Sequence, residues 1–223
     1  MTSRLARTRL LLLLTALLPL AALAATPNPQ PRGPAPVLDV DYTVIDGGLP
    51  YAPVKGKIEV VEVFGYTCHH CAHFEPLVSA WKTGLPADVS FTAVAAPMGG
   101  HWIPYARAFF AAQSLGVDRK THKAMFEALH VDGSLPLSRP TPEEIAGFYA
   151  SHGANAQRFV AAMASPATDA RLEQARAFMI RSGVQGTPAI VVNGRYRVIG
   201  TSFEDMLRIT DHLVARERAT KNR

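Results

Sequence analysis

The chain contains only two cysteines, Cys68 and Cys71, and they lie three positions apart where a valine-rich run passes into a helical pattern. Residues 58–64 are apolar except for two glutamates, as expected of a largely buried β-strand. A helix is predicted from about Cys68 to Trp81. A thiol at that junction meets the first backbone N–H groups of the helix, which have no partner within it and favour negative charge. The spacing therefore predicts an exposed, low-pKa thiol at Cys68 and a covered one at Cys71.

Other uses of this cysteine pair stay open on the residues alone. A disulfide that closes so short a loop stabilises a fold only slightly, which disfavours a purely structural bridge. A copper or zinc site would combine both thiols with His69 or His73. Two cysteines are too few for a four-cysteine zinc site or for a small disulfide-stapled scaffold.

His69 and His70 separate the two cysteines. Lowering a thiol pKa from about 8.5 to below about 5 takes roughly 5 kcal/mol of preference for the thiolate, and a helix dipole supplies at most about 2 kcal/mol. Backbone hydrogen bonds and any positive charge on the two histidines must supply the rest. Because a stabilised thiolate favours the reduced dithiol, the disulfide form becomes the stronger oxidant. The histidine pair therefore points to an oxidase.

The first 24 residues predict a signal peptide. Three arginines lie within residues 1–9, residues 10–23 are mostly apolar, and cleavage is expected before Ala25. The apolar run is shorter than the roughly 20 residues that span a bilayer. Of the 23 basic residues of the chain, 20 remain after cleavage against 18 acidic ones, a balance too even to indicate a nucleic-acid partner. Export would place the mature chain in an oxidising compartment.

The remaining chain predicts one α/β sheet with an inserted helical subdomain. Residues 25–36 hold five prolines and are expected to form a flexible leader. Strands are expected within residues 37–45 and at 58–64, 90–95, 189–192 and 196–199, the last two as a hairpin. Residues 103–181 show only helical patterns, with breaks expected at Gly116, Gly133, Gly153 and Pro166. A last helix is expected at about 203–218.

Over roughly residues 37–218 the chain resembles the DsbA family of thiol:disulfide interchange proteins, exported members of the thioredoxin-like superfamily. The matching pieces are Glu62-Val63-Phe64, Cys68-His69-His70-Cys71 with Phe74-Glu75, Met98-Gly99-Gly100, Gly186-Thr187-Pro188-Ala189 and Val192-Asn193-Gly194. The better-known members carry Pro-His between the cysteines, where this chain has two histidines.

The resemblance implies a fold and a division of the chain. The fold is α/β, thioredoxin-like, with an inserted all-helical subdomain. The thioredoxin-like domain would comprise residues 37–100 and 183–218, the helical insertion residues 101–182, and the tail residues 219–223.

It also implies a function. The protein would be a periplasmic enzyme, a dithiol oxidase that introduces disulfides into newly translocated proteins through a redox-active Cys68–Cys71 disulfide. It would need no metal or organic cofactor. Its partners would be unfolded exported proteins with free thiols and a quinone-linked membrane protein of the DsbB type that reoxidises it, and it would act as a monomer.

Residues outside the cysteine motif gain roles from the same resemblance. Glu62 is an isolated acid in a buried strand, and the family keeps an acid there that tunes proton movement to the covered thiol; the alternative is a structural carboxylate with hydrogen-bond partners. Thioredoxin-like folds place a cis-proline loop against the cysteines, so the Thr187–Pro188 bond is expected to be cis. Gly186, Thr187 and Pro188 would bind the backbone of the substrate as an added strand.

Two rival functions remain. A disulfide isomerase or reductase of the same superfamily is possible, but isomerases usually carry an N-terminal dimerisation domain, and residues 25–36 are too few to form one. The rival from another class is a periplasmic copper- or zinc-binding module that uses Cys68, Cys71 and a histidine.

Overall fold

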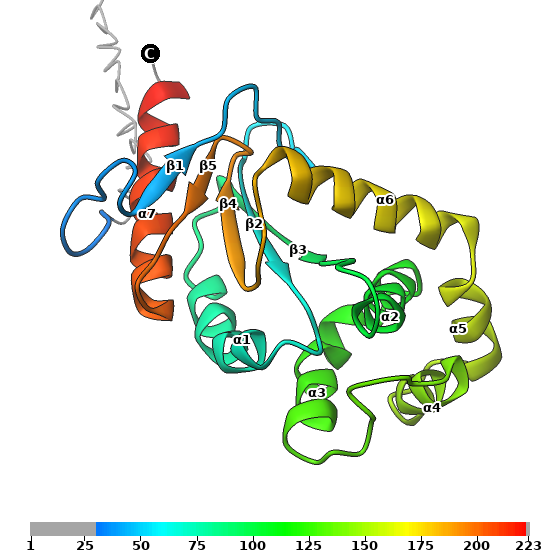
Figure 1. Ribbon diagram of the computed structural model, residues 1–223. Helices are drawn as coiled ribbons and strands as arrows, with labels where there is room; N and C mark the ends of the chain where they lie inside the picture. The colour runs from blue at the N-terminus through cyan, green and yellow to red at the C-terminus, as the bar shows by residue number, and fades with distance from the viewer. Residues whose placement is uncertain (1–29, 222–223) are drawn as a thin grey trace, which may run out of the picture.

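A mixed five-stranded sheet lies at the centre of the computed structural model, which describes residues 30–221 (Figure 1). The strands are β1 (Tyr42–Val44), β2 (Ile58–Phe64), β3 (Val89–Ala95), β4 (Ala189–Val192) and β5 (Tyr196–Val198), in the spatial order β1-β5-β4-β2-β3. Strand β2 pairs in parallel with β3 and antiparallel with β4. The predicted signal peptide and residues 25–29 of the leader lie outside the described residues.

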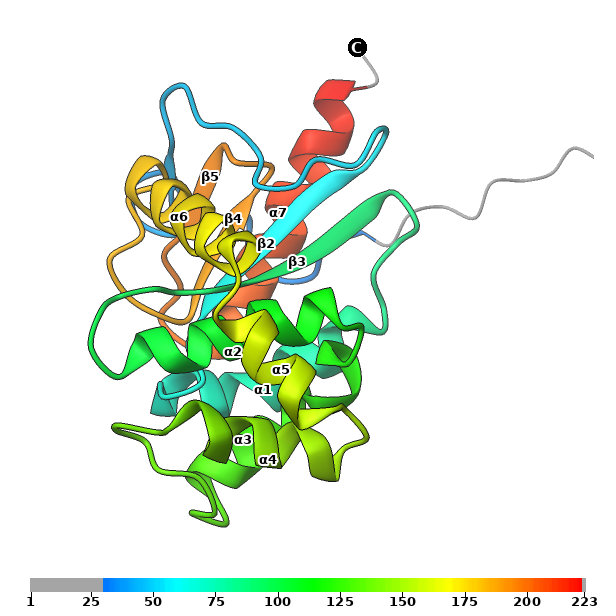
Figure 2. The same cartoon turned by 90° about the vertical axis from the view of Figure 1, so that its right-hand side faces the viewer.

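Residues 30–221 also form seven helices. They are α1 (His69–Lys82), α2 (Trp102–Ser114), α3 (Asp118–His130), α4 (Pro142–Ser151), α5 (Ala156–Met163), α6 (Pro166–Arg181) and α7 (Phe203–Lys221). Helices α1 and α7 cover one face of the sheet, and α2 and α6 contact the opposite side at β3 (Figures 1 and 2). This confirms the predicted α/β fold with a helical insertion, which lies between β3 and β4, while the domain boundaries stay a prediction. In this part of the chain no helix is long and apolar enough to cross a membrane.

Strand β2 is buried along its whole length because helices cover both sides of it. Val60 packs into the apolar cluster under α1 and α7, whereas Val61 and Val63 pack into the cluster formed with the helical insertion. Alternate residues of a strand point to opposite faces, so a strand covered on both faces needs apolar residues at successive positions. The valine-rich sequence of β2 follows from this placement.

The helices of the insertion end at or near the predicted breaks. Gly116, Gly133 and Gly153 follow helices with φ angles of +68°, +61° and +88°, a left-handed conformation that glycine adopts at little cost. A break also lies at Pro166, since α5 ends at Met163 and the next helix begins with the proline. Pro166 begins α6, directly after the Ser165 cap, because a residue in the first helical turn needs no backbone N–H donor.

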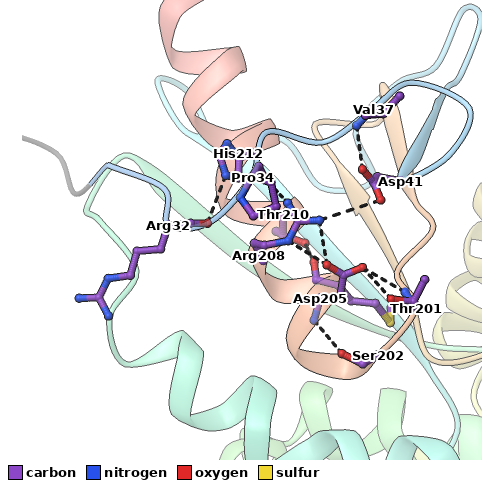
Figure 3. Close-up of polar contacts among 11 residues, drawn as sticks. Arg32, Pro34, Val37, Asp41, Thr201, Ser202, Asp205, Arg208, Thr210 and His212 are labelled. Atoms are coloured by element: carbon purple, nitrogen blue, oxygen red, sulfur yellow. Dashed lines mark hydrogen bonds and ion pairs between the residues drawn. The ribbon is translucent and has the colours of Figure 1, made fainter.

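Part of the predicted leader lies against α7 (Figure 3). The guanidinium of Arg208 donates to the Pro34 carbonyl, and His212 Nε2 donates to the Arg32 carbonyl at 3.2 Å. Gly33 has a φ of +79°, and a Cβ atom there would lie 2.9 Å from the Arg208 side chain. Residues 32–34 are therefore held on the last helix, and the flexibility of the rest of the leader stays a prediction.

The last helix is longer than the sequence predicts. It continues three residues beyond Arg218, to Lys221. The Arg218 guanidinium forms two hydrogen bonds with the Asp88 carboxylate, at 2.6 and 2.9 Å, and Lys221 Nζ donates to the Lys57 carbonyl at 2.8 Å. These bonds tie the last turn to the loops that precede β2 and β3.

Candidate active site

Cys68 caps the N-terminus of α1. Its backbone is extended, with φ −86° and ψ 115°, and its sulfur accepts a hydrogen bond from the backbone N–H of Cys71 at 3.4 Å. A turn from Gly65 to Cys68, closed by the Cys68 N–H on the Gly65 carbonyl at 3.1 Å, connects β2 to the helix. Both cysteines are free thiols. The fold thus places a sulfur where α1 has unpaired N–H groups.

The two thiols differ in pKa. That of Cys68 is lowered from 9.0 to about 5, mainly by the hydrogen bond with the Cys71 thiol; burial opposes this, and the Thr187 side chain and the N–H groups of Cys71 and His70 add to it. Burial raises the pKa of Cys71 far above its ordinary value, and the hydrogen bond with Cys68 raises it further. The two residues therefore form a pair with one stabilised thiolate and one thiol that keeps its proton.

Cys68 is less exposed than the sequence predicts. It retains 9% of its surface, whereas Cys71 is fully buried. The reason is the loop before β4, whose Thr187 carbonyl lies 3.5 Å from the Cys68 sulfur. Cys68 is still the accessible member of the pair, but a reacting partner reaches it through a small opening.

The two histidines of the motif contribute to the site through their backbone as well as through their side chains. Both side chains are exposed, and His70 lowers the Cys68 pKa through its backbone N–H. At the first turn of a helix the N–H groups point toward the cap while the side chains project outward. The ring of His69 lies 4.1 Å from that of His73 and 6.0 Å from that of His130, centroid to centroid. The catalytic roles of His69 and His70 stay predictions.

Glu62 is a buried acid without full hydrogen bonding. It retains 2% of its surface, and its Oε2 has no hydrogen-bond partner among residues 30–221. Burial, and next the negative charge of Glu75, raise its pKa from 4.5 to about 8, with Lys82 partly offsetting them. Glu62 therefore carries a proton at neutral pH. Since Glu75 and Lys82 both belong to α1, the carboxyl faces the helix that carries the two cysteines.

Helix α1 contributes another buried acid, Glu75, for which the sequence alone predicts no role. Glu75 lies 3.4 Å from His122 Nε2 and accepts a hydrogen bond from the Ser79 hydroxyl. Burial alone would raise its pKa, but the hydrogen bonds and charge of His122 and the bond from Ser79 outweigh burial and lower it. His122 in turn contacts the hydroxyl of Tyr66 through Nδ1 at 2.9 Å. Glu75 and Tyr66 lie within the motif region, but nothing in the sequence marks His122 as their partner.

The loop before β4 lies beside the cysteines as expected. The Thr187–Pro188 bond is cis. Gly186 is exposed, and no atom lies within 4 Å of the Cβ position that a larger residue would occupy. Open space therefore adjoins this loop at Gly186, while Thr187 and Pro188 are half-buried, and the role of the three residues in binding substrate stays a prediction.

The geometry does not favour the metal-binding alternative. Within the described residues no group of three or more His, Cys, Asp or Glu side chains is arranged so that it could hold a metal ion. A dithiol at a helix N-terminus, beside a cis-proline loop and on a sheet of this topology, defines the class of thioredoxin-like thiol:disulfide oxidoreductases.

Comparison with known proteins narrows this class. Residues 79–210 match the DSBA-like thioredoxin domain family. The thiol:disulfide interchange protein DsbA of Azotobacter vinelandii is 39% identical over 183 residues, which cover 81% of this chain and 84% of that protein. The protein of that name from Pseudomonas aeruginosa is 37% identical over 214 residues, which cover 93% of this chain and 97% of the relative.

A solved structure has the same fold. The crystal structure of the oxidoreductase DsbA from Xylella fastidiosa is 53% identical and superposes with a TM-score of 0.81, covering 82% of this chain and 98% of that one. This chain belongs to the DsbA family.

Proposed function

We propose that this protein is an exported dithiol oxidase that introduces disulfides into newly translocated proteins. The observation that carries the proposal is the contrast between the two thiols, with the pKa of Cys68 lowered to about 5 and that of Cys71 raised. Stabilising one thiolate stabilises the reduced dithiol, which makes the Cys68–Cys71 disulfide a good electron acceptor. Membership of the DsbA family supports the same function.

The reaction is two thiol–disulfide exchanges. A substrate thiolate attacks Cys68 Sγ, the bond between Cys68 and Cys71 breaks, and a mixed disulfide forms between the substrate and Cys68. Cys71 leaves with the electron pair and, because its pKa is raised, takes up a proton. A second substrate thiolate then attacks the substrate sulfur of the mixed disulfide, and Cys68 leaves as a stabilised thiolate. The substrate loses two electrons as its thiols become a disulfide, and the enzyme gains them as a dithiol.

Glu62 would exchange the proton of Cys71. With a pKa of about 8, Glu62 is protonated at neutral pH and close enough to that pH to lose and regain its proton. Glu62 would thus deliver a proton to the Cys71 thiolate when the disulfide opens and remove it on reoxidation.

Gly186, Thr187 and Pro188 would hold the substrate. A cysteine-containing segment in extended form would lie along these residues, with main-chain hydrogen bonds giving affinity for many sequences. Such binding suits unfolded exported proteins with free thiols. Reoxidation would come from a quinone-linked membrane protein of the DsbB type, and the site of action would be the periplasm.

The test is disulfide transfer from the oxidised protein to a reduced, unfolded model substrate. The wild type should transfer one disulfide per molecule, and Cys68→Ser should transfer none. In the reverse direction, the Cys68 thiolate of Cys71→Ser should attack the disulfide of an oxidised model substrate, release one substrate thiolate and remain joined to the other sulfur as a mixed disulfide. Transfer by Cys68→Ser would remove this cysteine from the mechanism.

Two further measurements separate the rivals. An isomerase would rearrange a scrambled substrate faster than it oxidises a reduced one. A metal-binding module would purify with stoichiometric copper or zinc and would show no exchange.

A further inference from the structure

The turn that carries Cys68 has one carbonyl whose direction decides its shape. Tyr66 and Thr67 are the two central residues of the turn that the Cys68 N–H closes on Gly65. Types I and II of such a turn differ mainly in the orientation of the central peptide, which here carries the Tyr66 carbonyl. A group that binds this carbonyl therefore fixes the turn and the approach of the chain to Cys68.

His130, the last residue of α3, binds that carbonyl. Its Nε2 lies 2.7 Å from the Tyr66 oxygen. Because a carbonyl only accepts hydrogen bonds, Nε2 carries the hydrogen and donates it. The bond joins residues 64 positions apart and connects the end of the inserted helix α3 to the turn that precedes Cys68.

His122, also in α3, binds the side-chain hydroxyl of Tyr66. It lies eight positions before His130, about two turns of α3, and its Nδ1 is 2.9 Å from the Tyr66 hydroxyl. Its Nε2 faces the Glu75 carboxylate at 3.4 Å, so one ring joins the Tyr66 hydroxyl to a buried acid of α1. Phe126, between the two histidines on this helix, packs against the Tyr66 ring with centroids 5.1 Å apart. Helix α3 thus contacts the ring, the hydroxyl and the carbonyl of Tyr66, and the ring also packs against Phe64 and Phe109.

The contact with α3 continues on the other side of Cys68. The His130 ring lies 6.0 Å from that of His69, the residue directly after Cys68. One histidine thus touches the chain two residues before the reactive sulfur and one residue after it.

We propose that His122 and His130 are positioning residues that hold the Gly65–Cys68 turn, so that the helical insertion sets the placement of Cys68 Sγ against the N–H groups of α1. The inference rests on the proposed function, because it concerns the thiolate that this function uses. Neither histidine touches the reacting sulfur.

The test is the pKa of Cys68 in His130→Leu and His130→Gln, with the thiolate followed by ultraviolet absorbance in the reduced protein. Leucine cannot donate to the Tyr66 carbonyl, whereas the glutamine amide can replace Nε2–H. Losing the bond should raise the Cys68 pKa by about one unit, which makes the thiolate fraction roughly fivefold smaller near pH 5, and His130→Gln should stay near the wild type. The equilibrium with glutathione should move about tenfold toward the enzyme disulfide in His130→Leu only.

His152→Leu is the matched control. His152 Nδ1 lies 2.8 Å from the Phe148 carbonyl in α4, so the variant loses the same kind of bond within the same set of helices. It should leave the Cys68 pKa unchanged.

Tyr66→Phe covers the case in which His130→Leu fails to fold, because it keeps the ring and removes only the hydroxyl. It should raise the Cys68 pKa by less than His130→Leu does, and urea melts of every variant report stability separately. The proposal is overturned if His130→Leu or Tyr66→Phe folds with an unchanged Cys68 pKa, or if His152→Leu raises that pKa as much. Failure of the proposed function is a different result, in which the wild type itself transfers no disulfide.

Discussion

Strand β2 carries two buried glutamates, three residues apart, that differ in their hydrogen bonding. Glu59 retains 1% of its surface and accepts hydrogen bonds from the backbone N–H groups of Tyr51 and Ala52, at 2.7 and 2.6 Å. Glu62 is equally buried, but one of its oxygens has no partner among residues 30–221 and its pKa is raised to about 8. An odd separation along a strand also sends the two side chains to opposite faces of the sheet.

The difference shows that burial alone does not define a functional carboxylate. Glu59 is the partnered structural acid that was one of the two interpretations open for Glu62. Its oxygens satisfy two N–H groups of the loop before β2, so it stabilises that loop. Among residues 30–221, no such donor binds Glu62 Oε2, and the carboxyl faces the negative charge of Glu75. Burying this acid is therefore unfavourable for the folded protein. This difference supports the proton-transfer role proposed for Glu62 and gives no such support for Glu59.

The largest expected effect is on the pH dependence of stability. The folded-state pKa of Glu62 lies above the unfolded value, so its contribution to stability is fully present below pH 4.5 and is lost as pH rises through about 8. Glu62→Gln removes this loss and should be about 3 kcal/mol more stable than the wild type at pH 7, with no difference at low pH. Urea melts of the oxidised proteins across this range measure it. Parallel stability curves for the two proteins would show that Glu62 is ionised in the fold.

Glu59→Gln should lower the free energy of unfolding, whereas Glu62→Gln should raise it at pH 7. One of the two backbone N–H groups would lose its charged acceptor and face an amide N–H instead, which should cost about 2 kcal/mol of unfolding free energy. The glutathione equilibrium should not change, because Glu59 lies on the face away from α1. If Glu59→Gln shifted that equilibrium, Glu59 would act on the cysteine pair, and the distinction between the two acids would fail.

The next effect in size is on the rate of disulfide exchange, which should depend on Glu62 but not on Glu59. Glu62→Gln keeps the shape of the side chain but cannot move a proton, so disulfide transfer should slow by about tenfold and lose the part of its pH dependence that lies near pH 8. Stopped-flow transfer to a reduced peptide, with Glu59→Gln as the matched strand variant, measures this. Equal rates in the wild type and Glu62→Gln would remove proton transfer from the role of this residue.

The smallest effect is expected at Lys82, whose charge partly offsets the rise in the Glu62 pKa. Lys82→Met keeps most of the apolar stem and removes the ammonium group, whose Nζ lies 4.9 Å from the centre of the Phe91 ring. The upper edge of the pH transition in stability should then move to higher pH. Lys55→Met, in the exposed loop before β2, serves as the control and should leave the transition where it is.

Much of this arrangement could be predicted from the sequence. The valine run, the Asn193-Gly194 turn and the left-handed glycines report local geometry, and each element they predict is present within a few residues. The cysteine spacing likewise locates the reactive sulfur at a helix N-terminus, because spacing and helix geometry are local properties.

The rest depends on contacts between distant segments. Thr187 lies 119 residues from Cys68, and its carbonyl reduces the exposure that the motif alone predicts. The partners of Tyr66 on α3 have no periodic or compositional signal, since histidines on a helix face are common. The share of each hydrogen bond in the low Cys68 pKa could not be predicted either, because a sequence shows side-chain types but not the direction of N–H groups.

The measurement that tests the account most directly is the ultraviolet thiolate titration of the reduced wild-type protein, with alkylation at each pH to assign the thiolate to Cys68. Hydrogen bonding at the start of α1 predicts a midpoint of about 5, while Cys71 stays protonated and unreactive throughout. A midpoint near the ordinary value of about 8.5 would mean that the fold does not stabilise the thiolate, and the protein would not be a strong oxidant.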